Sequence, residues 1–190
     1  AGNGVQRTHA HTVTPITPIT RRPPHPMSSS APCRHTLVAS VILRNDEDKY
    51  LMIQESKSSS RGKWYVPAGR VEAGESFWQG AVRECLEESG IEFVPTKLVN
   101  VWHHASKSGH WIRFCVTGIV AGGSLKSPGQ EDEHSIQAQW FSKEELHEMG
   151  DRGELRTLDF LQEVEAFESG NSLPCSKEEA LLSARGSSSH

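Results

Sequence analysis

One stretch of sequence decides the fold of this chain, Gly69-Arg-Val-Glu-Ala-Gly-Glu-Ser-Phe-Trp-Gln-Gly-Ala-Val-Arg-Glu-Cys-Leu-Glu-Glu-Ser-Gly-Ile91. It joins a loop that contains two glycines to a single predicted helix. Ser76 and Gln79 have the spacing of a capping box, which predicts that the helix begins directly after Ser76. Gly90 followed by Ile91 is typical of a left-handed glycine cap with its hydrophobic contact, so the helix is expected to end there.

The two faces of this helix differ in chemistry. At about 100° per residue, its apolar residues form one stripe and three glutamates lie largely opposite. Glu84 and Glu88 form a like-charge pair at i,i+4 spacing, and with Glu87 they crowd the negative end of the helix dipole. The simplest interpretation is a solvated acidic face. A functional site is the alternative, because a hard divalent cation with oxygen ligands would offset the repulsion. The core-facing stripe is Trp78, Ala81, Val82, Cys85 and Leu86.

The whole stretch resembles the Nudix box, G-x5-E-x7-R-E-U-x-E-E-x-G-U, in which U is a bulky apolar residue. Every fixed position matches, and Cys85, at one U position, is a small hydrophobe. The resemblance covers about residues 34–167 and implies a Nudix-type α/β/α sandwich with a central mixed sheet. The residue patterns also predict several strands with helices between and after them, which agrees with such an α/β fold. The matching positions are Gly69, Glu75, Arg83, Glu84, Glu87, Glu88, Gly90 and Ile91.

The resemblance also implies a chemistry, the hydrolysis of a diphosphate linkage. That reaction requires neutralised phosphate charge, a positioned water and a supported leaving oxygen, all of which metal ions can provide. Mg²⁺ prefers carboxylate oxygens, and Mn²⁺ is a second possibility. The metal ligands implied are Glu84, Glu87 and Glu88, with the backbone carbonyl of Gly69 as a further one. Glu84 and Glu87 are accordingly expected to be catalytic.

Two supporting roles follow from the same resemblance. Glu75 and Arg83 are expected to form an ion pair that orients the loop, and a purely architectural salt bridge is the alternative. The general base comes either from the box or from a loop beyond the central strands. Glu133 in the acidic segment 130–133 is the favoured loop residue, ahead of Glu131, with a solvated acidic loop as the alternative.

Aromatic residues near the box are candidates for substrate binding. Trp64, Tyr65 and Trp111 could each stack on a nucleobase, although aromatic residues in such positions are more often part of the core. Arg113 lies within an apolar strand pattern. Because an unpaired buried charge is costly, it is expected either to face the cleft or to pair with an acid.

The substrate is suggested by the sequence around the box. The segments 54–57 and 62–75 resemble Nudix hydrolases that act on oxidised purine nucleotides, which implies a substrate such as 8-oxo-dGDP. The alternatives are a hydrolase of another nucleoside diphosphate-linked compound, ADP-ribose or a nucleotide sugar, and a non-catalytic nucleotide-binding module. RNA decapping would require a basic RNA path that this composition does not show.

The net charge, apolar runs and cysteine spacing of the chain limit the partners and the location that can be expected. A net charge of −4 steers the chain toward neither nucleic acid nor an anionic membrane, so a small nucleotide is the expected partner, with the protein a monomer or homodimer. No apolar run is long enough to span a membrane. The four cysteines lack C-x-x-C spacing, which indicates reduced thiols and a cytoplasmic location.

Three segments are expected. Residues 1–33, rich in Pro, Ser and Thr, should be disordered. Being basic and free of acids, they could instead be an organellar targeting peptide, although prolines interrupt the apolar face that such peptides need. Residues 34–168 should form the Nudix hydrolase domain, and residues 169–190 a polar, mostly flexible tail with a weak helix at 176–182.

The secondary structure expected within the domain begins with a hairpin of strands 37–43 and 50–53. Further strands are expected at 98–104, 110–120 and 138–141. One helix should begin after Ser142 and another should span 155–167.

Overall fold

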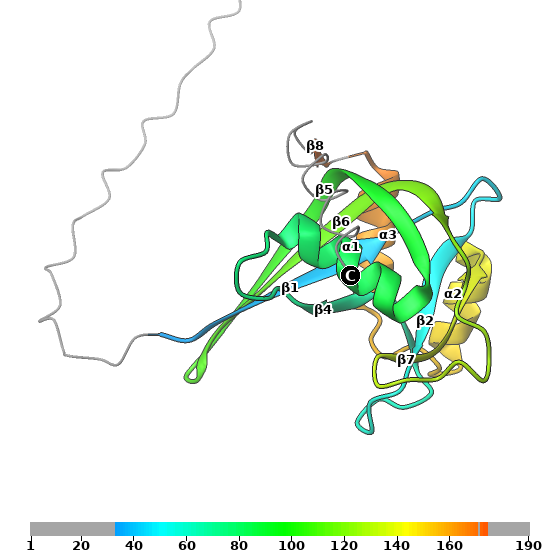
Figure 1. The fold of residues 1–190 in the computed structure, drawn as a ribbon, viewed down its shortest axis with the longest axis horizontal. Coiled ribbons are helices and arrows are strands. Elements are labelled where there is room, and N and C mark those ends of the chain that lie inside the picture. Colours follow the sequence, from blue (N-terminus) through cyan, green and yellow to red (C-terminus); the bar gives the residue numbers. More distant parts are fainter. Residues whose placement is uncertain (1–32, 171, 175–190) are drawn as a thin grey trace, which may run out of the picture. The chain divides into compact units, whose positions relative to one another are not determined.

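A computed structural model of the chain describes residues 33–170 and 172–174 (Figure 1). The segment 1–32 and the helix expected at 176–182 lie outside the described residues. The elements in chain order are β1 (His35–Ile42), β2 (Tyr50–Glu55), β3 (Trp64–Tyr65), β4 (Ala68–Arg70), α1 (Phe77–Ser89), β5 (Ile91–Ser106), β6 (Gly109–Gly123), β7 (Ser135–Phe141), α2 (Lys143–Asp151), α3 (Asp159–Glu168) and β8 (Leu173–Pro174).

The strands form two sheets. The larger has the order β4-β1-β6-β5-β8, and the smaller has the order β3-β2-β7. The larger sheet is mixed, because β1 runs parallel to β6 while β5 and β6 form a long antiparallel hairpin. Helix α1 packs on one face of this sheet and α3 on the other. The α/β fold with a mixed sheet flanked by helices is confirmed.

The side chains of β1 point alternately to the two faces of the sheet, and both faces are buried. Ala39 and Val41 contact the cluster that contains the apolar stripe of α1. Ile42 belongs to a second cluster with Cys115 of β6 and with Phe160 of α3. Successive strand residues point to opposite faces, so one buried strand serves both layers. Each large side chain buried this way contributes about 1.5–3 kcal/mol.

Helix α1 begins and ends where the sequence predicted. The Ser76 Oγ accepts a hydrogen bond from the Gln79 N–H at 3.3 Å, and the Ser76 N–H donates to the Gln79 side chain at 2.8 Å. Gly90 adopts the left-handed conformation (φ 75°) and its N–H donates to the Leu86 carbonyl. A Cβ at Gly90 would also clash with the backbone oxygen of Ser124. Both the positive φ and this close contact therefore favour glycine at this position.

The hairpin predicted from strands 37–43 and 50–53 is wrong. The two strands follow one another along the chain but belong to different sheets, and their contact is limited to the turn end, where Arg44 bridges to Tyr50 and the Leu51 N–H donates to the Leu43 carbonyl at 3.1 Å. Both edges of β1 are occupied by β4 and β6, and both edges of β2 by β3 and β7. Because β4 pairs with residues 38–40 of β1 and β3 with Ile53 and Gln54 of β2, contact between β1 and β2 is confined to their ends next to the turn.

The helix predicted over 155–167 begins later, at Asp159. The preceding residues use their backbone groups elsewhere: the Trp64 N–H donates to the Glu154 carbonyl and the Arg156 N–H donates to the Trp64 carbonyl, both at 2.9 Å. In the predicted tail, Leu173 and Pro174 pair with β5 as β8. No helix within the described residues is long and apolar enough to cross a membrane.

Candidate active site

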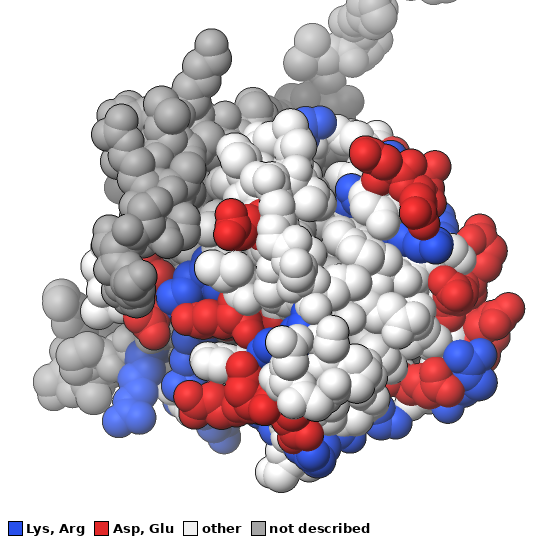
Figure 2. Space-filling model, turned by 45° about the vertical axis from the view of Figure 1, so that its right-hand side comes forward, with Lys and Arg blue, Asp and Glu red and all other residues white. Residues whose placement is uncertain are grey.

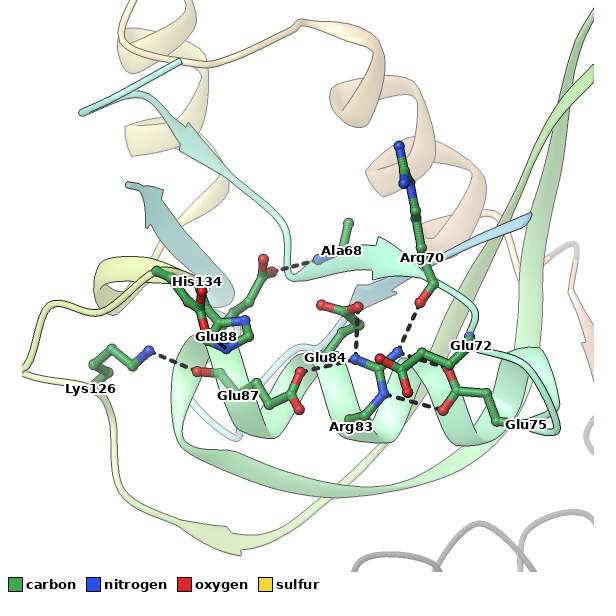
Figure 3. Close-up of polar contacts among 11 residues, drawn as sticks. Ala68, Arg70, Glu72, Glu75, Arg83, Glu84, Glu87, Glu88, Lys126 and His134 are labelled. Carbon is green, nitrogen blue, oxygen red and sulfur yellow. Dashed lines mark hydrogen bonds and ion pairs between the residues drawn. The ribbon is translucent and has the colours of Figure 1, made fainter. Parts of the chain in front are cut away.

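The three box glutamates lie on the side of α1 that faces β4 (Figure 3). Glu84 is 7% exposed and Glu88 is 2% exposed, while the Glu87 side chain is 35% exposed. The interpretation of these residues as a solvated acidic face is therefore wrong for two of the three. The central strands of the larger sheet cover the apolar stripe of α1, and the edge strand β4 of the same sheet covers Glu84 and Glu88.

Gly69 is placed directly against one of these carboxylates. It lies on the edge strand β4, opposite Ala39 of β1. A Cβ at this position would overlap the carboxylate of Glu84. The absence of a side chain at Gly69 thus makes room for a buried acid, which brings the backbone of β4 and the Glu84 oxygens together.

Arg83 joins the loop to the glutamates. Its guanidinium binds Glu75 in a bidentate manner, at 3.2 Å from Nε and 2.7 Å from Nη2. The Nη1 group donates to Glu84 and to Glu87, each at 2.9 Å, and Nη2 also donates to the Arg70 carbonyl at 2.8 Å. The expected ion pair between Glu75 and Arg83 is present. Paired donors of this kind fix geometry as well as charge, so the loop and the helix are held as one unit.

The pKa values in this unit diverge. Burial opposes ionisation of Glu75, but hydrogen bonds from Arg83 and from the Glu72 N–H bring its pKa below the ordinary value. Burial raises the pKa of Glu84, with Arg83 acting in the opposite direction. Burial also raises the pKa of Glu88 to about 8, although the Ala68 N–H donates to this carboxylate at 2.8 Å. Buried, mutually repelling carboxylates with raised pKa values mark a candidate site.

Lys126 is a residue of this region that the sequence reasoning missed. Helix α1 has no basic residue in its last turn. Lys126, from the loop 124–134, donates instead to the Glu87 carbonyl at 2.7 Å and pairs with Asp132 at 2.8 Å (Figure 3). The Ser135 hydroxyl donates to the next carbonyl, that of Glu88, at 2.5 Å. The cation that a helix C-terminus prefers therefore comes from a distant loop, and the acidic last turn without a basic residue was the signal for it.

Glu133 lies in the same loop. Its backbone carbonyl accepts a hydrogen bond from the Ser56 hydroxyl at 2.9 Å, which holds this part of the loop beside the end of β2. Its carboxylate is 89% exposed and lies 3.8 Å from the His134 imidazole. The structure therefore places Glu133 in the loop that docks on α1, with its side chain in solvent. Its role as general base stays a prediction.

Of the four residues predicted to bind substrate, the structure brings Tyr65 and Arg113 together. Arg113 donates to the Tyr65 hydroxyl and pairs with Glu163 at 2.5 Å. Glu163 is fully buried, and burial raises its pKa while Arg113 opposes the shift. Of the two expected environments for Arg113, pairing with an acid is the one present. Trp64 packs edge-on against Phe141, with ring centroids 4.8 Å apart.

Trp111 lies further along β6, near the hairpin end. It is 44% exposed and lines a hollow of about 270 Å³ together with Arg34 and His104. Alternation along β6 places Trp111, Arg113 and Cys115 on the same face of the sheet, and Cys115 belongs to the cluster of α3. The glutamates lie on the α1 face. A ligand that contacts both sets would have to cross the edge of the sheet formed by β4.

The donor atoms are all oxygens, the type of ligand that a hard divalent cation prefers. All three side chains are carboxylates and project from one helix, and the backbone of Gly69 is adjacent to Glu84. Glu84 and Glu87 turn toward Arg83, and Glu88 turns toward the Ala68 N–H. In this arrangement no three His, Cys, Asp or Glu side chains of residues 33–170 and 172–174 are gathered around one metal position.

Comparison with known proteins agrees with this geometry. The NUDIX domain family matches residues 34–162. The chain is 34% identical over 177 residues to putative nudix hydrolase 1 of Caenorhabditis elegans, covering 86% of this chain and 47% of the relative. It is 38% identical over 109 residues to the 8-oxo-dGDP phosphatase NUDT18 of Mus musculus, covering 57% of this chain and 33% of the relative.

A solved NUDIX hydrolase from Nitrosomonas europaea superposes with a TM-score of 0.62 at 29% identity, covering 74% of this chain and 93% of that one. The chain spans less than half the length of the worm and mouse relatives. The matched region begins before β1 and ends within α3, and it contains both sheets except for β8. The chain belongs to the Nudix family.

Proposed function

We propose that this protein hydrolyses a diphosphate linkage in a nucleoside diphosphate derivative, with Mg²⁺ as cofactor and Mn²⁺ as a possible substitute. The observation that supports this most directly is the placement of three carboxylates on one side of α1, with Glu84 against Gly69, Glu88 on the Ala68 N–H and Glu87 held by Arg83. Two of these carboxylates are buried, and one guanidinium holds two of them. Such an arrangement is unfavourable without a function for the charge, because acids buried together repel one another.

Each box residue has a proposed role. Glu84, Glu87, Glu88 and the Gly69 carbonyl would hold the metal ion, which when bound supplies charge neutralisation on the phosphate and an activated water. Arg83 orients the carboxylates of Glu84 and Glu87 by direct hydrogen bonds at 2.9 Å.

Glu75 supports the same unit from the loop, because it holds Arg83 through two hydrogen bonds. Glu133 is the proposed general base, supplied by the loop that Lys126 attaches to α1. Within the box, Glu84 and Glu87 are the proposed catalytic carboxylates.

The proposed substrate is an oxidised purine nucleotide such as 8-oxo-dGDP. The name of the mouse relative, an 8-oxo-dGDP phosphatase, supports this choice. Trp64, Tyr65, Trp111 and Arg113 are the proposed substrate-binding residues, and Trp111 offers the most exposed aromatic surface of the three rings.

Other nucleoside diphosphate-linked compounds, ADP-ribose or a nucleotide sugar, remain the alternative substrates. A non-catalytic nucleotide-binding module is the alternative function. The intact set of box glutamates argues against it, because a domain that only binds has no use for buried acids held in this way.

The remaining proposals concern partners and location. On the face drawn in Figure 2, acidic and basic side chains are interspersed, so this face offers no basic path for a nucleic acid. We propose a nucleotide as the small-molecule partner, a cytoplasmic location and a monomer or homodimer. Size-exclusion chromatography with light scattering checks the last of these.

A substrate panel tests the activity. The protein is incubated with 8-oxo-dGDP, 8-oxo-dGTP, ADP-ribose and a nucleotide sugar, each with Mg²⁺, with Mn²⁺ or with a chelator, and the products are identified. We expect Mg²⁺-dependent turnover of the oxidised diphosphate. Turnover that survives chelation would contradict the metal mechanism, and calorimetric binding without any product would favour the non-catalytic module.

The Glu87→Gln variant tests the site itself. Glu87 is the most exposed of the three box acids, so the amide should be tolerated by the fold while turnover falls by orders of magnitude. Glu92→Gln, at an exposed position just beyond the helix, is the matched control and should retain full activity. Near-normal activity of the Glu87 variant would remove this residue from the metal ligands.

A further inference from the structure

Arg156 lies between α2 and α3, and its backbone is fixed against the segment that leads into the box. The Arg156 N–H donates to the Trp64 carbonyl, and the Trp64 N–H donates to the Glu154 carbonyl, both at 2.9 Å. Trp64 belongs to β3, which is followed directly by β4 and by the Ala68 N–H that binds Glu88. Arg156 is therefore attached to the segment that leads into β4, although it is distant from the box in sequence.

The side chain of Arg156 is fixed as well. Its Nη1 group pairs with the Glu55 carboxylate at 2.5 Å, and its guanidinium carbon lies 4.9 Å from the centre of the Tyr65 ring. Even so, the side chain is 43% exposed. An arginine has five N–H donors, and the pair with Glu55 uses only one nitrogen. The guanidinium is thus pre-oriented, with donors left for a ligand.

Glu55 links this arginine to the acids of α1. It is 2% exposed, and among the described residues its Oε2 has no hydrogen-bond partner. Glu55 pairs with Ser135 across β2 and β7, and the Ser135 hydroxyl donates to the Glu88 carbonyl. Burial is the largest cause of the raised pKa of Glu88, and the charge of Glu55 adds to it. The pair of Glu55 and Arg156 therefore lies next to the glutamate end of α1.

Three other cations near the site are already engaged. Arg83 binds three carboxylates and a carbonyl. Arg113 is bound to Glu163 and Tyr65, with only 13% of its side chain exposed. Lys126 is 9% exposed and bound to Asp132 and to the Glu87 carbonyl. Arg156 differs from these in being both oriented and half-exposed.

We propose that Arg156 is a phosphate-binding residue of this site, and that Glu55 is the positioning residue that aims its guanidinium at a phosphate group of the nucleotide. Planar guanidinium groups bind phosphate through paired donors, which a fixed orientation favours. The stacking of Arg156 on Tyr65 restricts it further, so less side-chain freedom is lost when a phosphate binds. This inference rests on the proposed function, because it assumes a nucleotide with a diphosphate linkage.

The test compares Arg156→Met with Arg152→Met. Arg152 is a matched control, because it is similarly exposed and pairs with Glu154 and Glu148 at the end of α2. Two quantities are measured for the full chain, the KM for 8-oxo-dGDP and the Kd for inorganic pyrophosphate by calorimetry. For Arg156→Met we expect both to rise about tenfold, the scale of one charge-assisted hydrogen bond, with kcat changed much less. Arg152→Met should change neither, and Arg156→Lys should recover part of the affinity.

Glu55→Gln tests the positioning role. We expect a smaller rise in both constants, and no additional rise when Glu55→Gln is combined with Arg156→Met, because the two residues act as one pair. A merely structural pair would lower the urea midpoint of unfolding in the variants and leave the pyrophosphate Kd unchanged. That result, or a wild-type protein that binds no pyrophosphate, would overturn the proposal. A protein that binds pyrophosphate through Arg156 but hydrolyses no nucleotide would instead overturn the proposed hydrolase function alone.

Discussion

The carboxylate of Glu84 occupies the space that the Cβ of any side chain at position 69 would fill. Gly69 is absent from the residues with positive φ, so the requirement for glycine does not come from backbone conformation. It comes from the approach of a buried acid to the edge strand β4. The first residue of the box and an acid near the end of its helix are therefore one structural unit.

Gly69→Ala should break this unit. The new methyl group forces the Glu84 carboxylate to move and disturbs its 2.9 Å contact with Arg83, so we expect destabilisation of about 1–3 kcal/mol and a large loss of turnover. Urea unfolding and steady-state kinetics measure the two effects. Gly122→Ala is the control, because the nearest atom to its Cβ is the Glu92 carboxylate at 3.9 Å. Equal activity of the two variants would contradict the steric explanation.

Removal of the Arg83 charge should be more severe. Arg83→Met leaves Glu75, Glu84 and Glu87 without their shared cation, and an uncompensated buried charge typically costs about 3 kcal/mol or more. We expect a lower urea midpoint and loss of turnover. Arg83→Lys retains the charge but cannot hold several acids in one plane, so it should recover stability better than activity. An unchanged urea midpoint in Arg83→Met would show that the ion pairs contribute nothing to folding.

The limits of α1 were predictable because its caps are local. The Ser76 capping box and the left-handed Gly90 depend on residues within one turn of each end. The burial of Glu84 and Glu88 was not predictable in the same way, because it depends on β4 packing over the acidic side of the helix. The motif identified these acids as functional without revealing their environment.

The errors in the predicted fold share one cause, which is competition for backbone hydrogen bonds by residues distant in sequence. The β1–β2 hairpin is confined to its turn end because β4 and β3 pair with the rest of the two strands on that side. The start of α3 shifts because residues 154–156 bond to Trp64. In the site, Lys126 and Arg156 could not be found from sequence for a different reason, because only the completed fold brings their partners Glu87 and Glu55 to them.

Lys126→Met should loosen the loop 124–134 from the end of α1. The substitution removes the donor to the Glu87 carbonyl and the pair with Asp132, at an expected cost of about 1–2 kcal/mol. Because Glu87 then loses its backbone anchor, turnover should fall severalfold. Lys143→Met, which removes a comparable ion pair with Glu168 far from the box, is the control. If both variants retain the same turnover, the loop attachment has no part in positioning Glu87.

The stability of the metal-free protein should depend on pH through Glu88. Burial raises the pKa of this carboxyl from its ordinary 4.5 to about 8, so the folded state binds more protons than the unfolded state between these values. The contribution of Glu88 to stability is therefore fully present below about pH 4.5. It is lost as the pH rises toward 8, at about 1.4 kcal/mol per pKa unit.

Glu88→Gln isolates this effect, because the amide keeps an oxygen for the Ala68 N–H and cannot ionise. In the presence of a chelator, urea unfolding of the wild type and the variant should give similar stabilities at pH 5, and the variant should be the more stable protein at pH 8.5. Glu92→Gln, at an exposed position, should follow the wild type at both pH values. Addition of Mg²⁺ should stabilise the wild type at pH 8.5 more than the Gln variant, which lacks one of the proposed ligands, since a cation beside Glu88 favours its charged form. A constant difference between wild type and variant at all pH values would contradict the raised pKa.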